Sequence, residues 1–233
     1  MNDFESKVLN DIRLEAVLKS IIDETSKWGF KQADYLKLVN SLLDLSLNKT
    51  NAPNTNGIFN KTYKINMKLP LQGENISIRL IKDDYNLLET WLEDDYSRWF
   101  MVSRSYTRDN TLKEILDDKR NLIGIIIHND STPIGAMGFL DYDEIQHKAE
   151  MRKLIGEKAY LGKGFAKEAT ELWIKYGINN LGLKKIYLNT IENNIKNVTL
   201  NKELGFEVEG ILRKECFIDG KYYDLLRMSL IVE

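Results

Sequence analysis

The sequence predicts a mixed α/β fold, α+β in type, in which a mostly antiparallel sheet is flanked by helices and follows a helical N-terminal extension. Apolar residues recur at helical spacing from Phe4 to about Leu47. Beyond residue 73, segments in which apolar residues recur every second position, as in a strand, alternate with segments in which they recur at helical spacing. Three of the strand-like runs follow one another, which favours an antiparallel meander within the sheet.

The N-terminal extension, residues 1–48, is predicted to form two amphipathic helices. The helical spacing breaks at Trp28-Gly29-Phe30, where a glycine can end the first helix and allow a hairpin. Two helices of this size are marginally stable alone, so we expect them to dock on the rest of the chain or on a partner.

A linker is predicted over residues 49–72, ahead of a single domain over 73–233. The ten residues from Asn51 to Asn60 hold four asparagines, a proline and a glycine, a composition typical of irregular chain. Two of the three prolines, Pro53 and Pro70, also fall in this segment.

The elements of the domain are predicted from periodicity, caps and turn residues. In chain order they are a strand over 76–81, a helix capped by Asp83 or Asp84 that ends near Glu93, a short helix over 111–118, strands over 121–128, 134–142 and 148–155, a helix over 164–179, a strand over 185–190, a helix over 194–204, and two strands flanking Asp219-Gly220. The helix over 164–179 carries its apolar residues on one face, so we expect it to pack between buried strands.

Composition excludes several classes of function. The chain has 33 basic and 35 acidic residues, and this balance argues against nucleic acid or an anionic membrane surface as the main partner. One cysteine, Cys216, and two histidines supply neither a disulfide nor a cluster of metal ligands, so we expect no metal site and a reducing compartment. The first twenty residues lack the pattern of a signal peptide, and no segment has the length and apolarity of a membrane span, so a cytoplasmic protein is expected.

A glycine-rich turn, Leu161-Gly-Lys-Gly-Phe-Ala166, falls between a predicted strand and a predicted helix. Backbone N–H groups at the positive end of a helix form an anion site. The turn lacks the serine or threonine of a Walker loop, because Gly164 follows Lys163, and it lacks the third glycine of a dinucleotide fingerprint, where Lys167 stands. A plain turn without a ligand is the alternative.

Three asparagines, Asn194, Asn197 and Asn201, lie three and four residues apart on the predicted helix over 194–204. This spacing places three primary amides on one stripe, where they can face a ligand that itself bears amides. A solvated helix face is the alternative.

Three stretches together resemble a known family. They are Ala149-Glu150 leading through Leu154-Ile155-Gly156 to the glycine-rich turn, the run from Asn194 to Glu203-Leu-Gly-Phe206, and the tail Glu209 to Arg213 with Asp219-Gly220 and Asp224. In this order, over Ile76 to Val232, the chain resembles the GNAT superfamily of acetyl-CoA-dependent N-acetyltransferases. The similar branch holds the ribosomal-protein N-terminal, spermidine and nucleotide-amino-sugar acetyltransferases.

The resemblance implies a binding site for acetyl-CoA. The turn from Leu161 through Gly162, Lys163, Gly164, Phe165 and Ala166 to Lys167 would hold the pyrophosphate through backbone N–H groups, and the strand edge at Leu154, Ile155 and Gly156 would pair with the pantetheine amides. Asn194 matches the position that binds the pantetheine arm. Asn201 stands where the family often has a tyrosine that is proposed to protonate the leaving thiolate, and Leu161 replaces a frequent arginine or glutamine.

Glu150 is the predicted catalytic base. Amide formation needs an uncharged amine, whereas a free alkylammonium has a pKa of about 10 by analogy with lysine. On a strand Glu150 shares a face with Arg152 and Leu154, and it matches a glutamate often seen in the similar branch. A surface ion pair with Arg152 is the alternative. A backbone N–H near Leu154 or Ile155 would polarise the carbonyl.

The acceptor site is predicted between Trp91 and Tyr106, where carboxylates can attract an amine and aromatic rings can stack on it. The candidate residues are Glu93, Asp95, Trp99 and Phe100, with Asp141 at a strand end. A helix end with solvated acids is the alternative. The expected acceptor is a small amine, with a nucleotide-linked amino sugar slightly ahead of a polyamine or an aminoglycoside. Alternatives are a protein N-terminus or lysine, and an acyl-CoA-binding module without turnover whose N-terminal helices bind a partner. Family habit also makes a homodimer plausible.

Overall fold

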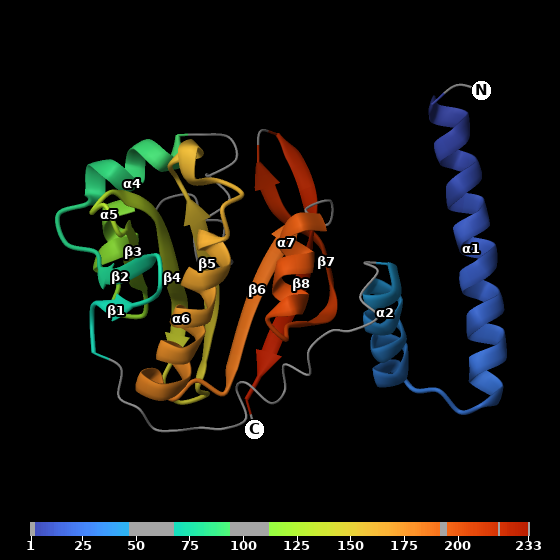
Figure 1. Cartoon of the computed structure of the whole chain (residues 1–233). Helices are drawn as coiled ribbons and strands as arrows, with labels where there is room; N and C mark the ends of the chain where they lie inside the picture. Colours follow the sequence, from blue (N-terminus) through green and yellow to red (C-terminus); the bar gives the residue numbers. More distant parts are fainter. Residues whose placement is uncertain (1–2, 47–67, 94–111, 192–194, 219, 233) are drawn as a thin grey trace. The chain divides into compact units, whose positions relative to one another are not determined.

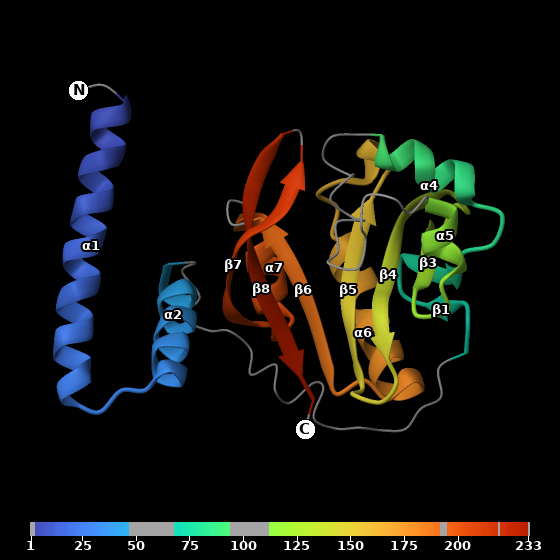
Figure 2. The same cartoon turned by 180° about the vertical axis from the view of Figure 1, so that it is seen from behind.

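The computed structural model describes residues 3–46, 68–93, 112–191, 195–218 and 220–232 (Figures 1 and 2). The chain divides into two compact units, Met1–Thr50 and Asn51–Glu233. The predicted helical extension falls in the first unit and the predicted sheet in the second. In the part of the chain that is described, no helix combines the length and the apolar character that crossing a bilayer requires.

The first unit is formed by α1 (Asp3–Lys27) and α2 (Gln32–Ser46). Gly29, with φ +76°, lies in the short connection at the predicted break. Thr25 Oγ1 donates to the Tyr35 hydroxyl at 2.9 Å, so the two helices contact each other beside this connection. Several apolar side chains of this unit are 42–70% exposed: Leu14, Val17, Leu18, Ile22, Trp28, Val39, Leu42 and Leu45. The contact between the two helices therefore leaves these side chains exposed.

Within the described residues, the second unit contains one sheet with the strand order β1-β2-β3-β4-β5-β6-β8-β7. Its strands are β1 (Leu71–Gln72), β2 (Ile76–Leu80), β3 (Leu122–His128), β4 (Pro133–Asp143), β5 (Lys148–Ile155), β6 (Lys185–Ile191), β7 (Glu207–Ile218) and β8 (Lys221–Ile231). All neighbours pair antiparallel except β5 and β6, which are parallel. The predicted mixed, mostly antiparallel sheet is thus confirmed. β1 lies in the range predicted as linker, because two residues are too few to show a period.

Helices cover both faces of the sheet. α6 (Phe165–Leu181) and α7 (Ile195–Glu203) lie on one face, and α4 (Tyr85–Leu92) and the short α5 (Leu112–Asp117) lie toward the other, as Figures 1 and 2 show. On the α6 face, Trp173 stacks on Phe139 of β4 with ring centroids 5.3 Å apart. On the α4 face, Trp91 and Leu88 form a buried cluster with Ile125, Ala136 and Leu154.

β5 and β6 separate partway along their length. Their pairing covers Lys148 with Lys185, Ala149 with Ile186 and Glu150 with Tyr187, and it stops there. β5 continues to Ile155 and β6 continues to Ile191 without pairing to each other, and Figure 1 shows the two strands diverging. We call this unpaired region, residues 151–155 and 188–191, the β5–β6 fork.

Candidate functional site

The edge of β5 in the fork has lost its neighbour on the β6 side. Backbone N–H and C=O groups on an unpaired edge need other partners, so this edge fits an extended ligand that carries amides. Leu154 and Ile155, two of the residues predicted to bind pantetheine, lie on this edge and have buried side chains. The structure therefore places these residues where strand-like pairing with a ligand is available.

Gly156, at the end of this edge, allows the strand end to lie close to the Trp91 ring of α4. A Cβ at this position would lie 2.3 Å from the Trp91 ring, so only glycine lets the indole pack against the strand end. Trp91 is in turn fixed by its Nε1, which donates to Glu157 Oε1 at 2.9 Å. The requirement for glycine here therefore comes from the packing of α4 against the end of β5.

The glycine-rich turn joins the short helix η2 (Lys158–Tyr160) to α6. Gly162 and Gly164 have φ of +74° and +89°, the left-handed region that favours glycine, and a Cβ on either would meet nothing within 4 Å. The first bond of α6 runs from Lys167 N–H to Gly164 C=O at 3.0 Å, so the earlier N–H groups have no intrahelical acceptor. This open turn with free N–H groups at a helix N-terminus fits a pyrophosphate.

The remaining predicted residues of the turn flank these N–H groups. Leu161 and Lys163 are exposed, and Phe165 and Ala166 are half-buried at the start of α6. Lys167 Nζ contacts Glu203 Oε2 of α7 at 3.0 Å, so this lysine links the two helices that border the fork.

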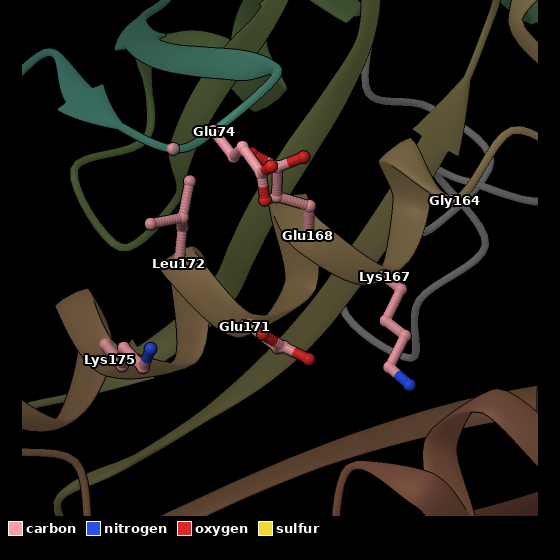
Figure 3. Close-up of a pocket in the computed structure, with 8 residues that line it drawn as sticks. Glu74, Gly164, Lys167, Glu168, Glu171, Leu172 and Lys175 are labelled. Carbon is pink, nitrogen blue, oxygen red and sulfur yellow. The ribbon is translucent and has the colours of Figure 1, made fainter.

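A hollow of about 350 Å³ lies on the outer side of α6 beside the turn (Figure 3). It is lined by Gly73, Glu74, Gly164, Lys167, Glu168, Glu171, Leu172 and Lys175. Asn75 holds Glu168 through its backbone N–H at 2.9 Å and its side-chain amide at 3.1 Å. Figure 3 shows Lys167 extending away from Glu74 and Glu168. Its three carboxylates, Glu74, Glu168 and Glu171, make this hollow unsuitable for phosphate.

The asparagine stripe of α7 faces the strands of the fork. Asn197 Nδ2 donates to Thr190 Oγ1 of β6 at 3.2 Å, whereas Asn201 Oδ1 accepts from Lys153 Nζ of β5 at 2.6 Å. Asn201 is fully buried, which excludes the solvated-face alternative for this residue. Asn194 lies outside the described residues. α7 therefore contacts both arms of the fork through its amides.

Lys153 was not among the residues predicted for the site. It extends from the face of β5 that it shares with Ala149, Met151 and Ile155, and those three neighbours are buried and apolar. Burial lowers the pKa of Lys153 to about 7, because desolvation disfavours the ammonium. A lysine in the apolar alternation of a strand is the signal that could have identified it.

Glu150, the predicted base, lies on the opposite face of β5 and is 1% exposed. Its Oε1 lies 2.6 Å from Arg152 Nη2 and accepts from Asn189 Nδ2 at 2.8 Å. The alternative, a surface ion pair with Arg152, is correct about the partner and wrong about the surface, because both side chains are buried. The reason is that β5 is a central strand with β4 and β6 on its two sides at this point.

Tyr187 of β6 lies near two predicted site carboxylates, Glu150 and Asp141. Burial, with the added repulsion of Glu150 and Asp141, raises the pKa of Tyr187 to about 12. The Arg227 guanidinium lies 4.9 Å from the Tyr187 ring centroid, and its Nε donates to Asn189 Oδ1 at 3.0 Å. Glu150 and Asp141 therefore both lie near enough to Tyr187 to affect its pKa.

Asp141 is half-buried and has φ +51°. Its backbone N–H donates to Asn121 Oδ1 at 3.1 Å, and this hydrogen bond fixes its backbone. Of the other residues predicted for the acceptor, Glu93 is exposed at the C-terminal end of α4. Asp95, Trp99 and Phe100 lie outside the described residues.

Comparisons with known proteins support the fold and show the family. The family model of the acetyltransferase (GNAT) domain matches residues 76–207. The spermidine N(1)-acetyltransferase of Escherichia coli K12 is 28% identical over 162 residues, which cover 69% of this chain and 83% of that protein.

Solved structures of the spermidine N-acetyltransferase from Vibrio cholerae are similar too. One, in complex with CoA and spermine, has a TM-score of 0.58 and 25% identity and covers 68% of this chain and 96% of that chain. A dodecameric structure of the same enzyme in an intermediate state has a TM-score of 0.58 and 26% identity, with 68% of this chain and 95% of that chain covered.

Proposed function

Because the chain belongs to the GNAT acetyltransferase family, and is therefore an acetyl-CoA-dependent N-acetyltransferase, we propose that its acceptor is a polyamine such as spermidine. The observation that carries this proposal is the similarity to spermidine acetyltransferases over 83% or more of their length. The expectation that placed a nucleotide-linked amino sugar slightly ahead finds no support in these relatives and gives way to the polyamine. Membership of an enzyme family also sets aside the binding module without turnover.

On the donor side, we propose that the turn from Leu161 to Lys167 holds the pyrophosphate and that the β5 edge at Leu154, Ile155 and Gly156 pairs with the pantetheine amides. The left-handed glycines, the free N–H groups of α6 and the loss of pairing after Glu150 support this assignment. The donor supplies an activated acetyl group, and the protein's part is to fix that group at the fork.

On the acceptor side, we propose that Glu150 removes the proton from the attacking amine, directly or through water. Support comes from its burial on the face of β5 that also carries Arg152 and Leu154, since a buried carboxylate keeps its place relative to the reacting groups. Asp141, whose charge also raises the pKa of Tyr187, adds negative charge that favours a cationic acceptor.

An acceptor panel tests the polyamine proposal. Spermidine, spermine, a nucleotide-linked amino sugar and a peptide with a free N-terminus would each be incubated with acetyl-CoA, with release of coenzyme A as the measurement. We expect spermidine or spermine to have a kcat/KM at least about 10²-fold above the other acceptors, equivalent to about 2.7 kcal/mol. Preferential turnover of the peptide or of the amino sugar would overturn the proposal.

A further inference from the structure

The site has a base on one face of β5, but Asn201 stands at the position where the family often has the proton donor. A primary amide has no acidic proton near neutral pH, so Asn201 cannot protonate a thiolate itself. A group that can release a proton should therefore lie next to Asn201 if the reaction retains acid assistance.

Lys153 is that neighbour. Its Nζ donates to Asn201 Oδ1 at 2.6 Å, a charge-assisted contact between two residues 48 positions apart in the chain. Within the described residues Lys153 makes no ion pair, and burial is the one cause of its shifted pKa. Among the residues that the structure describes, the ammonium therefore has no carboxylate that would hold its proton.

Asn201 shows a second sign that a ligand completes this site. It is fully buried, and its Nδ2 has no hydrogen-bond acceptor among the described residues. A buried donor without an acceptor is costly and uncommon in a folded protein. An acceptor atom from a ligand bound in the fork, where Asn201 meets β5, would remove that cost.

We propose that Lys153, positioned by Asn201, is the general acid that protonates the sulfur of the departing coenzyme A. The proposal rests on the family's donor chemistry and not on the identity of the acceptor amine. Lys153 and Glu150 then lie on opposite faces of the same strand, so that acid and base act from the two sides of the fork.

The proton and electron balance is complete. The neutral amine nitrogen forms a bond to the acetyl carbon and loses one proton to Glu150, which later releases it to solvent. The carbon–sulfur bond breaks, and its electron pair goes to sulfur. Lys153 Nζ gives one proton to that sulfur and becomes a neutral amine, and it regains a proton from solvent after release of the products. Burial lowers the pKa of Lys153 to about 7, below the value of about 8.5 for a thiol, so the transfer runs downhill.

Kinetics of two variants separate proton donation from positive charge. Lys153→Met removes the acid at similar length, and Lys153→Arg keeps the charge but holds its proton at all working pH values. We expect kcat to fall about 10²-fold in both, with the KM for acetyl-CoA within about threefold, because the role is confined to the chemical step. Lys148→Met, in the paired part of β5, is the matched control and should keep the activity of the wild type. Full activity of Lys153→Arg would overturn proton donation.

The pH dependence supplies a further test with a definite sign. The Lys153 ammonium is present below about pH 7 and lost above it, so acid assistance should disappear as the pH rises. We expect a descending limb in the kcat profile of the wild type that is missing from Lys153→Met. Parallel profiles for the two proteins would contradict the proposal.

A titration without any acceptor distinguishes failure of this proposal from failure of the polyamine proposal. Protein labelled with ¹⁵N-lysine would be followed by NMR at the Nζ signal, assigned by its absence in Lys153→Met. We expect coenzyme A to shift the titration of this signal, and desulfo-coenzyme A, which lacks the sulfur, to leave it near that of the free protein. The same titration with both compounds would show that Lys153 does not face the sulfur and would overturn the proposal.

Discussion

Glu150, our proposed base, also has a structural role. The carboxylate is buried against Arg152 and Asn189, and removing its charge leaves a buried guanidinium without its counter-ion. A substitution at this residue therefore changes folding stability as well as the reaction. Tests of its role must measure the two effects separately.

Replacement of Glu150 by glutamine is expected to lower kcat by about 10²-fold or more at neutral pH, the scale of a lost general base. The amide oxygen of the introduced glutamine can still accept from Asn189, so we expect a loss of stability of about 3 kcal/mol, the lower end of the cost of breaking a buried ion pair. Thermal unfolding and the pH dependence of kcat measure the two effects. A pH profile unchanged in shape would eliminate Glu150 as the base.

Glu209→Gln is a matched control for this test. Glu209 is half-buried on β7, accepts from Ser229 Oγ at 2.8 Å and pairs with Lys185. The variant should lose stability through a broken ion pair while its kcat stays near that of the wild type. Equal losses of kcat in the two variants would attribute the effect at Glu150 to folding.

The glycine-rich turn and α6 form the element that binds phosphate in our assignment. Gly164 begins this helix and Gly182 ends it, and both have left-handed φ, +89° and +67°. A Cβ on Gly164 meets nothing within 4 Å, and one on Gly182 meets only His147 Nδ1 at 3.9 Å. The two positions therefore have the same backbone requirement at opposite ends of one helix.

Gly164→Ala and Gly182→Ala should each lower the free energy of unfolding by about 1 kcal/mol, because alanine is strained in the left-handed region. Only Gly164→Ala should also raise the KM for acetyl-CoA, by about fivefold, or about 1 kcal/mol, because its turn shifts relative to the N–H groups. Thermal unfolding and KM measurements check the pair. A similar rise of KM in Gly182→Ala would mean that α6 as a whole, and not its N-terminal turn, determines binding.

Local signals predicted the elements of this fold, and contacts between distant residues determined what could not be predicted. The turn at Gly162 and Gly164 and the strands around Asp219-Gly220 depend on neighbouring residues, so the sequence pattern was sufficient for both. The contact of Lys153 with Asn201 joins β5 to α7 and depends on the fork, which no period in the sequence indicates. The burial of the ion pair between Glu150 and Arg152 likewise depends on β6 lying beside β5.

At the scale of the whole molecule, the match to the acetyltransferase family, residues 76–207, lies entirely within the second unit. About two thirds of this chain covers 83–96% of the matched spermidine acetyltransferases. The Vibrio cholerae enzyme described as a dodecamer is covered to 95% by 68% of this chain. If this chain self-associates as that relative does, the surfaces needed for assembly should lie in the second unit.

Deletion of residues 1–50 tests this division. The cut falls at the boundary of the two compact units, so we expect residues 51–233 to fold and to keep kcat within about twofold of the full chain, a difference below about 0.5 kcal/mol. Native mass spectrometry should give the same oligomeric state for both proteins, a homodimer or larger. The deletion should also lower non-specific association, because it removes the apolar side chains that α1 and α2 leave exposed. Loss of turnover together with a smaller assembly would show instead that the helical unit organises the active form.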